Sequence, residues 1–178
     1  MPTQIKDPVT LVSRAGRHLQ RYDKGFRQVV GCIPYRYRET NEASPTNGAL
    51  SGQLEVLVIS AQNGQGMLFP KGGWETDEPI KKAAMRETRE EAGVIGDIEP
   101  ELGEWIYKSK RRSIIHKGYM FPLLVKDELE FWPEKNFRER RWVSVSKARE
   151  ICPHLWMREA LEELVRRQTQ LKRRGCEE

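Results

Sequence analysis

The pattern of apolar and polar residues first predicts the strands of a sheet. Residues 26–37 show an alternating pattern of apolar and polar side chains and are rich in valine, isoleucine and tyrosine. This predicts a strand whose apolar centre is flanked by Arg27 and Arg36. Residues 53–60 carry a nearly continuous apolar run, which is typical of a strand buried on both faces. The same reasoning predicts shorter strands at residues 67–70, 102–109, 116–125 and 138–143.

A helix is predicted from residue 78 to residue 92. Asp77 is suited to cap its N-terminus, Pro79 fits its first turn, and Gly93 is a typical stop signal. At about 100° per residue, three glutamates fall on the same side as the small and apolar residues. The inward side holds Ile80, Ala83, Ala84, Glu87, Glu90 and Glu91, and the solvent side holds Lys81, Lys82, Met85 and Arg89.

Two further helices are predicted near the C-terminus. Ser146 is expected to cap a brief helix over residues 146–151, and residues 154–171 form an amphipathic pattern. The packed stripe of this second helix is expected to consist of Leu155, Leu161, Leu164 and Val165.

Strands on both sides of one central helix, followed by a terminal helix, predict the α/β class with a mixed sheet packed between helices. Residues 1–20 are expected to form an extended arm, and residues 21–171 a single domain. The polar stretch 39–52 reads as a loop inside that domain, and residues 172–178 as a solvated, frayed tail.

Composition limits the classes of protein that fit. No run of about 18 apolar residues occurs, so no membrane span or membrane partner is predicted. The cysteines, Cys32, Cys152 and Cys176, are scattered, which favours a reducing compartment over a disulfide framework. The basic N-terminus contains Asp7 and two prolines and lacks a clear transit-peptide pattern. We therefore expect a cytoplasmic or nuclear protein, with import into an organelle such as the mitochondrion left open.

The net charge of +5 conceals a segregation of charge. Acidic residues predominate between residues 69 and 104, whereas residues 14–38 and 107–117 are strongly basic. An acidic pocket set among basic flanks suits a metal ion and a highly anionic small-molecule substrate, although basic residues are often simply solvated.

The three inward glutamates predict a metal site. Carboxylates at helical spacing repel one another, and next to an apolar face that repulsion is costly unless a cation lies among them. Mg²⁺ prefers oxygen ligands and keeps several waters, one of which can act as a nucleophile. The alternative is a solvated acidic face, which is disfavoured because the three glutamates fall on the inward side of the helix. Directly after the strand predicted at residues 67–70, Lys71, Gly72 and Gly73 read as a turn whose N–H groups and charge can cradle a phosphate.

The spacing of this region resembles the Nudix box, GX5EX7REUXEEXGU, in which U is a bulky aliphatic residue. Gly72 is followed by five residues and Glu78, then by seven residues and the run from Arg86 to Val94, and only Thr88 departs from the pattern. Thr88 is expected to bond to the carbonyl four residues earlier. The resemblance implies an α/β/α sandwich and hydrolysis of a phosphoanhydride with Mg²⁺ or Mn²⁺.

The resemblance also implies roles for individual side chains. Glu87 and Glu91 would be metal ligands, and Glu90 either the catalytic base or a further ligand. Arg86 would hold Glu90 by an ion pair, and Glu78 would be either a distal support or a charge favoured by the helix dipole.

Four segments beyond the box are similar to diphosphoinositol polyphosphate phosphohydrolases, particularly the plant members: residues 22–27, 70–73, 116–119 and 137–142. In that subfamily, basic residues from the first strand, the hairpin after the box and the late strand surround an inositol phosphate. Glu139 departs from the subfamily pattern. The expected substrate-binding residues are Arg27, Arg36, Lys71, Gly72, Gly73, Arg111, Arg112, Lys117, Arg138 and Arg140.

Two alternatives stay open. A nucleotide-specific hydrolase acting on dinucleoside polyphosphates, ADP-ribose or a capped RNA end would stack Trp74, Trp105 or Tyr107 on a base. The downstream proline of the ADP-ribose subgroup is replaced here by Lys110, and no nucleic-acid partner other than a capped RNA end is expected. A non-catalytic polyphosphate-binding module is the second alternative, which the intact trio of glutamates disfavours.

Overall fold

The computed structural model describes residues 12–38, 53–62, 66–109 and 113–175. Within these residues a nine-stranded mixed sheet is organised around β2 (Phe26–Tyr37), whose bounds are those predicted. This strand pairs in parallel with β8 (Ile115–Glu128) and antiparallel with β3 (Leu54–Ser60) and β5 (Lys71–Gly73). The shorter strands are β1 (Tyr22–Asp23), β4 (Met67–Leu68), β6 (Val94–Ile98), β7 (Gly103–Lys108) and β9 (Arg140–Ser144).

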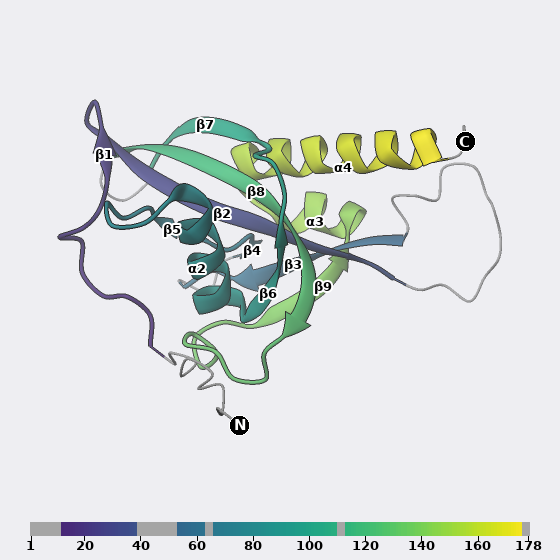
Figure 1. Cartoon of the computed structure of the whole chain (residues 1–178), viewed down its shortest axis with the longest axis horizontal. Helices are drawn as coiled ribbons and strands as arrows, with labels where there is room; N and C mark the ends of the chain where they lie inside the picture. The colour runs from purple at the N-terminus through teal and green to yellow at the C-terminus, as the bar shows by residue number, and fades with distance from the viewer. Residues whose placement is uncertain (1–11, 39–52, 63–65, 110–112, 176–178) are drawn as a thin grey trace, which may run out of the picture.

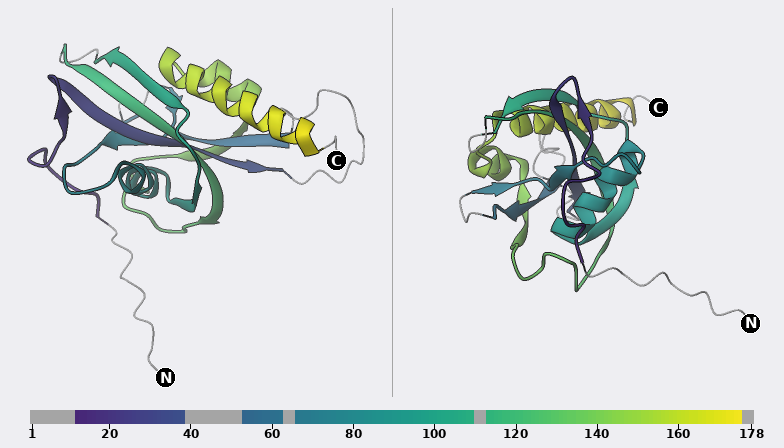
Figure 2. Two further views of the ribbon diagram at one scale, coloured as in Figure 1. Left: turned by 45° about the horizontal axis from the view of Figure 1, so that its top comes forward. Right: turned by 90° about the vertical axis from the view of Figure 1, so that its left-hand side faces the viewer.

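Helices cover the sheet on both faces, which confirms the predicted α/β class (Figure 1). The helix α2 (Ile80–Ala92) packs against β2, β5 and β6. On the opposite side lies α4 (Leu155–Gly175), as the left view of Figure 2 shows. The short α3 (Val145–Ile151) packs against β3 and β9. No helix among the described residues is long and apolar enough to cross a membrane.

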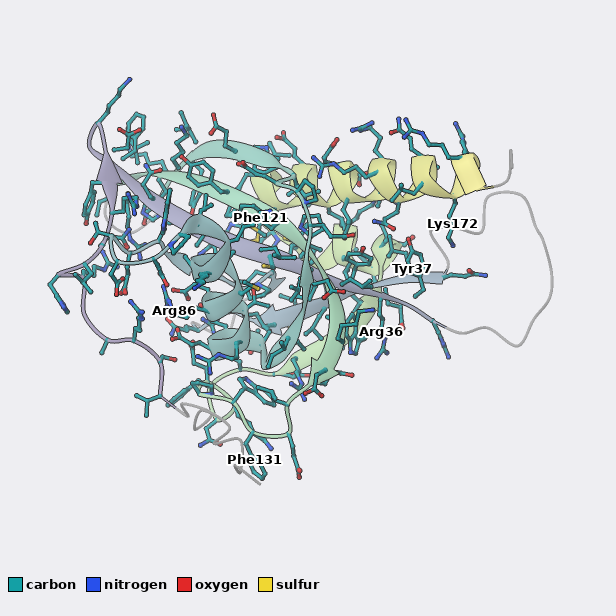
Figure 3. All side chains as sticks on the ribbon, viewed as in Figure 1. Arg36, Tyr37, Arg86, Phe121, Phe131 and Lys172 are labelled. Atoms are coloured by element: carbon teal, nitrogen blue, oxygen red, sulfur yellow. The ribbon has the colours of Figure 1, made fainter. Side chains whose placement is uncertain are left out.

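The core lies on both faces of β2. Residues 28–35 of this strand are buried, and apolar side chains from β3 and β8 surround them, including Phe121 (Figure 3). Full burial of one large apolar side chain contributes roughly 1.5–3 kcal/mol. The strand that carries Arg27 at one end and Arg36 at the other is therefore fixed firmly in the molecule. The largest fully buried side chains include Phe69, Ile33, Leu57, Ile59 and Met120.

Three predicted helix boundaries are wrong. The cap of α2 is Pro79, which offers no side-chain hydrogen bond, because the Asp77 carboxylate instead accepts a hydrogen bond from Arg14. Ser144, not Ser146, caps α3 and accepts a hydrogen bond from the Lys147 amide at 3.1 Å. The terminal helix continues to Gly175, so the start of the predicted tail is helical.

Three further expectations are corrected by packing. Leu155 is 63% exposed, and the buried stripe of α4 consists of Trp156, Met157, Ala160, Leu161 and Leu164. Met85 is half-buried against the core instead of facing solvent. The strand β6 was not predicted, since its sequence lacks a long apolar run, and Lys71–Gly73 forms an edge strand instead of a turn.

Candidate active site

Helix α2 presents its glutamates to the protein interior because small residues share their side of the helix. Ala83 and Ala84 are fully buried, which lets the helix approach β2 closely. Gly93 ends the helix in the left-handed region at φ 65°. Thr88 Oγ1 donates to the Ala84 carbonyl at 2.8 Å, as the sequence predicted. The carboxylates of Glu87, Glu90 and Glu91 are buried on this side, with 9%, 4% and 7% exposure.

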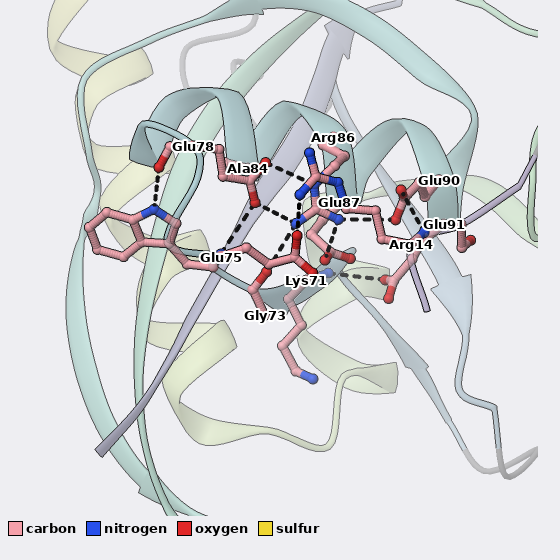
Figure 4. A network of polar contacts seen from close by, with 12 residues as sticks. Arg14, Lys71, Gly73, Glu75, Glu78, Ala84, Arg86, Glu87, Glu90 and Glu91 are labelled. Atoms are coloured by element: carbon pink, nitrogen blue, oxygen red, sulfur yellow. Dashed lines mark hydrogen bonds and ion pairs between the residues drawn. The ribbon is translucent and has the colours of Figure 1, made fainter. Parts of the chain in front are cut away.

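The Arg86 guanidinium forms hydrogen bonds with three carboxylates, those of Glu78, Glu87 and Glu90 (Figure 4). Its Nε and Nη2 donate to the two oxygens of Glu78 at 2.9 and 2.6 Å. Its Nη1 donates to Glu87 Oε1 at 2.9 Å and to Glu90 Oε2 at 3.2 Å. A further bond from Nη2 to the Gly73 carbonyl, at 3.0 Å, joins the helix to β5. The guanidinium therefore sets the positions of two box glutamates relative to the edge strand.

The Glu91 carboxylate is held by groups from two separate segments of the chain. The backbone N–H of Lys71 donates to Oε2 at 3.1 Å, and Arg138 Nη2 donates to Oε1 at 3.2 Å. Arg138 is itself buried and also contacts Glu134 and the Ser60 carbonyl. Burial still raises the pKa of Glu91 to about 7, although the positive charges of Arg138 and Lys71 oppose the shift.

Glu87 carries the least compensated charge of the three. Arg86 binds its Oε1, whereas its Oε2 accepts no hydrogen bond from any described residue. Burial, with the neighbouring charge of Glu91, raises the pKa of Glu87 to about 8. A β-carbon at Gly72 would overlap this carboxylate, so the strand leaves just enough room for it. Buried carboxylate oxygens that lack compensating charge fit a hard divalent cation such as Mg²⁺ or Mn²⁺.

A second acidic group lies beside the helix N-terminus. Carboxylate oxygens of Glu75, Asp77 and Glu78 come within 4.8 Å of one another, which those of the three buried box glutamates do not. Arginines already compensate this group, because Arg14 binds Glu75 and Asp77 while Arg86 binds Glu78. Sequence reasoning missed Arg14, whose only signal was its place in a basic N-terminal stretch.

Two cavities flank β5. The first, of about 690 Å³, lies on the α2 side and is lined by Arg14, Arg17, Arg27, Gly72, Gly73 and the three box glutamates. The second, of about 620 Å³, lies against α4 and β7 and is lined by Lys71, Tyr107, His116 and Trp156 among others. Successive side chains of a strand point to opposite faces, so Gly72 faces Glu87 while Lys71 points the other way.

A group of basic residues, Arg17, Arg27, Lys71 and His116, lies where the two cavities meet. Arg27 on β2 is paired with His116 on β8, and its Nε donates to Gln20 Oε1 at 3.0 Å. Burial and the charges of Arg27, Lys71 and Arg17 lower the pKa of His116 to about 4. Burial likewise lowers the pKa of Lys71. None of these four residues forms an ion pair with a described carboxylate. Glu87 and Glu91 act on Arg27 and Lys71 only through their charge, without a direct ion pair, so the donor groups of these cations can bind an anionic ligand.

The other predicted substrate-binding residues lie elsewhere. Arg36 binds Glu55 and Glu128 and lies over the Trp142 ring, well away from Arg86 (Figure 3). Lys117 lines neither cavity: its Nζ lies 3.3 Å from Glu104 and over the Tyr119 ring. Arg138 and Arg140 line neither cavity: Arg138 holds Glu91, and Arg140 donates to the carbonyls of Ala92, Gly93 and Leu129. Arg111 and Arg112 lie outside the described residues.

The aromatic residues considered for base stacking are engaged by the protein. Tyr107 stacks on Trp156 with ring centroids 4.5 Å apart and an interplanar angle of 8°. Trp105 packs against the same Trp156 and donates its Nε1 to Glu159. Trp74 meets Tyr119 edge to face, donates to the Glu78 carbonyl, and is covered by the guanidinium of Arg21.

This arrangement of a glycine edge strand and a glutamate-bearing helix defines a class of hydrolases. The NUDIX domain pattern matches residues 46–168, and the chain belongs to the Nudix family. Nudix hydrolase 4 of Arabidopsis thaliana is 60% identical over 166 residues, covering 93% of this chain and 78% of the relative. The protein is therefore a Nudix hydrolase, an enzyme that hydrolyses phosphoanhydride bonds, and members of this family generally use a divalent metal ion.

Two more distant similarities bear on substrate and fold. Diphosphoinositol polyphosphate phosphohydrolase 2 of Mus musculus is 32% identical over 130 residues, covering 71% of this chain and 64% of the relative. The crystal structure of a C. elegans Ap4A hydrolase binary complex superposes with a TM-score of 0.59 at 21% identity, covering 80% of this chain and 98% of that one. The latter shows the shared fold.

Proposed function

We propose that the protein hydrolyses phosphoanhydride bonds in diphosphoinositol polyphosphates, with dinucleoside polyphosphates as a second class of substrate. The observation that carries the proposal is the cation cluster of Arg17, Arg27 and Lys71 beside the neutral imidazole of His116, none of which forms an ion pair with a described carboxylate. Arg17 and Arg27 line the same cavity as the buried glutamates of α2, whereas Lys71 and His116 line the cavity on the other side of β5. A substrate with many phosphates can place one group at the glutamates and others at the cluster.

The chemistry follows from the arrangement of the carboxylates. Glu87 and Glu91 would hold Mg²⁺ or Mn²⁺, which supplies charge to the phosphoryl oxygens and lowers the pKa of a water. Glu90 accepts the proton of the attacking water, and Arg86 keeps its Oε2 in place at 3.2 Å. A β-carbon at Gly73 would lie 2.1 Å from Gln20 Oε1, so only glycine fits beside Gln20 and Arg27 at this point of the strand. No covalent enzyme intermediate is needed.

The aromatic contacts favour an inositol polyphosphate over a nucleotide. A base stacks on an aromatic face, and one face of Tyr107 is taken by Trp156 while one face of Trp74 is taken by Arg21. An inositol ring carries phosphates in every direction, so cations spread over distant segments suit it. Arg17, Arg27, Lys71 and His116 come from four separate segments of the chain.

The proposal is tested by Arg27→Ala with a diphosphoinositol polyphosphate as the substrate. KM is expected to rise about tenfold or more with a smaller change in kcat, because the lost contact serves binding. Affinity of the wild type should also fall steeply with salt, since exposed charge contacts are screened over about 10 Å at 0.1 M. Arg36→Ala is the matched control, because Arg36 lies at the other end of the same strand.

Trp74→Ala and Tyr107→Ala should change KM less than Arg27→Ala, provided that thermal unfolding shows intact packing. If both aromatic substitutions dominate and Arg27→Ala is silent, the substrate is a nucleotide and the inositol assignment is wrong. If wild-type protein binds the polyphosphate but releases no phosphate with Mg²⁺, it is the non-catalytic module.

A further inference from the structure

The segment that precedes β1 lies across the helix α2. Its described part, residues 12–20, lines the cavity on the α2 side through Val12, Ser13, Arg14, Gly16, Arg17 and Gln20. Gln20 forms a β-bridge with Glu75, and the Thr76 amide donates to the Leu19 carbonyl at 2.8 Å. Ser13 Oγ also lies 3.4 Å from Glu134. The segment therefore forms a wall of the active site, a feature that its expected role as an extended arm did not predict.

This wall contacts Glu90 through a single backbone group. The Arg14 N–H donates to Glu90 Oε1 at 3.2 Å, while Arg86 holds the other carboxylate oxygen at the same distance. Arg86 alone would leave the carboxylate free to rotate about its remaining torsions. Two donors on opposite oxygens, from two different segments, fix the plane of the carboxylate.

The Arg14 side chain anchors this backbone group. Its guanidinium forms an ion pair with Glu75, and the same group lies 3.0 Å from Asp77 Oδ1. Both partners precede α2, so the clamp joins the wall to the segment that leads into the box helix. Because two protein carboxylates already occupy the guanidinium, it is not the group that a substrate phosphate would meet first.

We propose that Arg14 is a positioning residue, which clamps the N-terminal segment to Glu75 and Asp77 so that its own N–H orients Glu90. The inference rests on the proposed role of Glu90 as the base, but not on the inositol substrate. It applies equally to any phosphoanhydride substrate, since the contact is to the catalytic helix.

The test measures steady-state kinetics of Arg14→Ala with Mg²⁺, using a diphosphoinositol polyphosphate and diadenosine hexaphosphate as separate probes. Arg14→Ala keeps the N–H but removes the clamp. We expect kcat to fall about tenfold with KM within about twofold, because a bond to a charged group is lost only from the reacting arrangement. Arg14→Lys should recover most of kcat, since a lysine can still pair with Glu75. Lys81→Ala, an exposed cation on α2 without an ion pair in the described structure, is the control.

Amide hydrogen exchange of the metal-free protein provides a readout that needs no turnover. Arg14→Ala should speed exchange across residues 12–17 and leave α2 unchanged. A rise in KM at constant kcat would make Arg14 a substrate contact and overturn the proposal. Unchanged kcat despite a loosened segment would also overturn it. A wild type that turns over diadenosine hexaphosphate alone would contradict the inositol substrate and leave the Arg14 result valid.

Discussion

The carboxylate of Glu87 lies directly against the α-carbon of Gly72, at a distance that excludes a β-carbon. The backbone of Gly72 cannot yield easily, because β5 is paired with β2 and Gly72 faces Val30 in that register. The glycine of the edge strand and the first glutamate of the buried trio are therefore fitted to one another, although fifteen positions separate them in the chain.

Gly72→Ala is expected to displace Glu87 and weaken divalent-metal binding by about 10- to 100-fold, in the range seen when a group that supports a metal ligand is lost. Titration of Mn²⁺ by calorimetry measures the effect. Gly175→Ala is the control, because nothing lies within 4 Å of a β-carbon there. Equal metal affinity of Gly72→Ala and wild type would show that the close contact does not position a ligand.

Much of this site could be predicted from the sequence. The spacing of Glu87, Glu90 and Glu91 fixes their common side of the helix, and the small residues beside them fix that side as inward. Arg14 could not be predicted, because its contacts depend on how a segment without regular structure crosses α2. The buried role of Arg138 was missed as well, since sequence does not show whether a late-strand arginine faces a cavity or a carboxylate.

Some elements of the fold could likewise be predicted from the sequence, and others could not. The strand β2 was predicted to the residue because its valine, isoleucine and tyrosine residues favour a strand, although it is buried on both faces and not on alternate positions. The strand β6 escaped, since it has the burial pattern of an edge strand and contains Gly96, which lies close to the Leu124 backbone. The α2 cap was misjudged because Asp77 has a tertiary partner in Arg14.

Glu91→Gln should abolish turnover while the fold stays intact. Loss of one charge weakens metal binding and relieves repulsion with Glu87, and Arg138 keeps Glu134 as a partner. Thermal unfolding without metal should therefore occur at an equal or higher temperature than in the wild type. Near-normal turnover of the purified variant at saturating Mg²⁺ would remove Glu91 from the set of ligands.

Glu90→Gln separates a base from a ligand. If Glu90 is the base, its replacement by glutamine should lower kcat on the order of 10²-fold or more, with little change in metal affinity. Kinetics and Mn²⁺ titration on the same preparation give both values. A collapse of metal affinity together with kcat would assign Glu90 to the metal and leave the base to be found elsewhere.

The stability of the metal-free protein should fall as pH rises. Burial raises the pKa of Glu87 from 4.5 to about 8 and that of Glu91 to about 7, so the folded state keeps protons that the unfolded state has already released. The contribution of these two protonated carboxyls to the free energy of unfolding is complete below about pH 4.5, and it is lost as pH rises through 7 and 8. Thermal unfolding between pH 5 and 8 measures this.

Glu87→Gln is the control for that pH series, because it cannot release a proton. The variant should show a flatter decline than the wild type, and saturating Mg²⁺ should flatten the wild-type curve in the same range. A metal-free wild type whose stability rises across this interval would show that the buried glutamates are already compensated.

The central claim is that this Nudix hydrolase acts on inositol pyrophosphates. The most direct test is kcat/KM with Mg²⁺ on one panel: diphosphoinositol polyphosphates, dinucleoside penta- and hexaphosphates, ADP-ribose and a capped RNA. The cation cluster and the covered aromatic rings predict the highest value for a diphosphoinositol polyphosphate, with dinucleoside polyphosphates second. Preferred turnover of ADP-ribose or capped RNA, with no phosphate released from the diphosphoinositol substrate, would contradict the account.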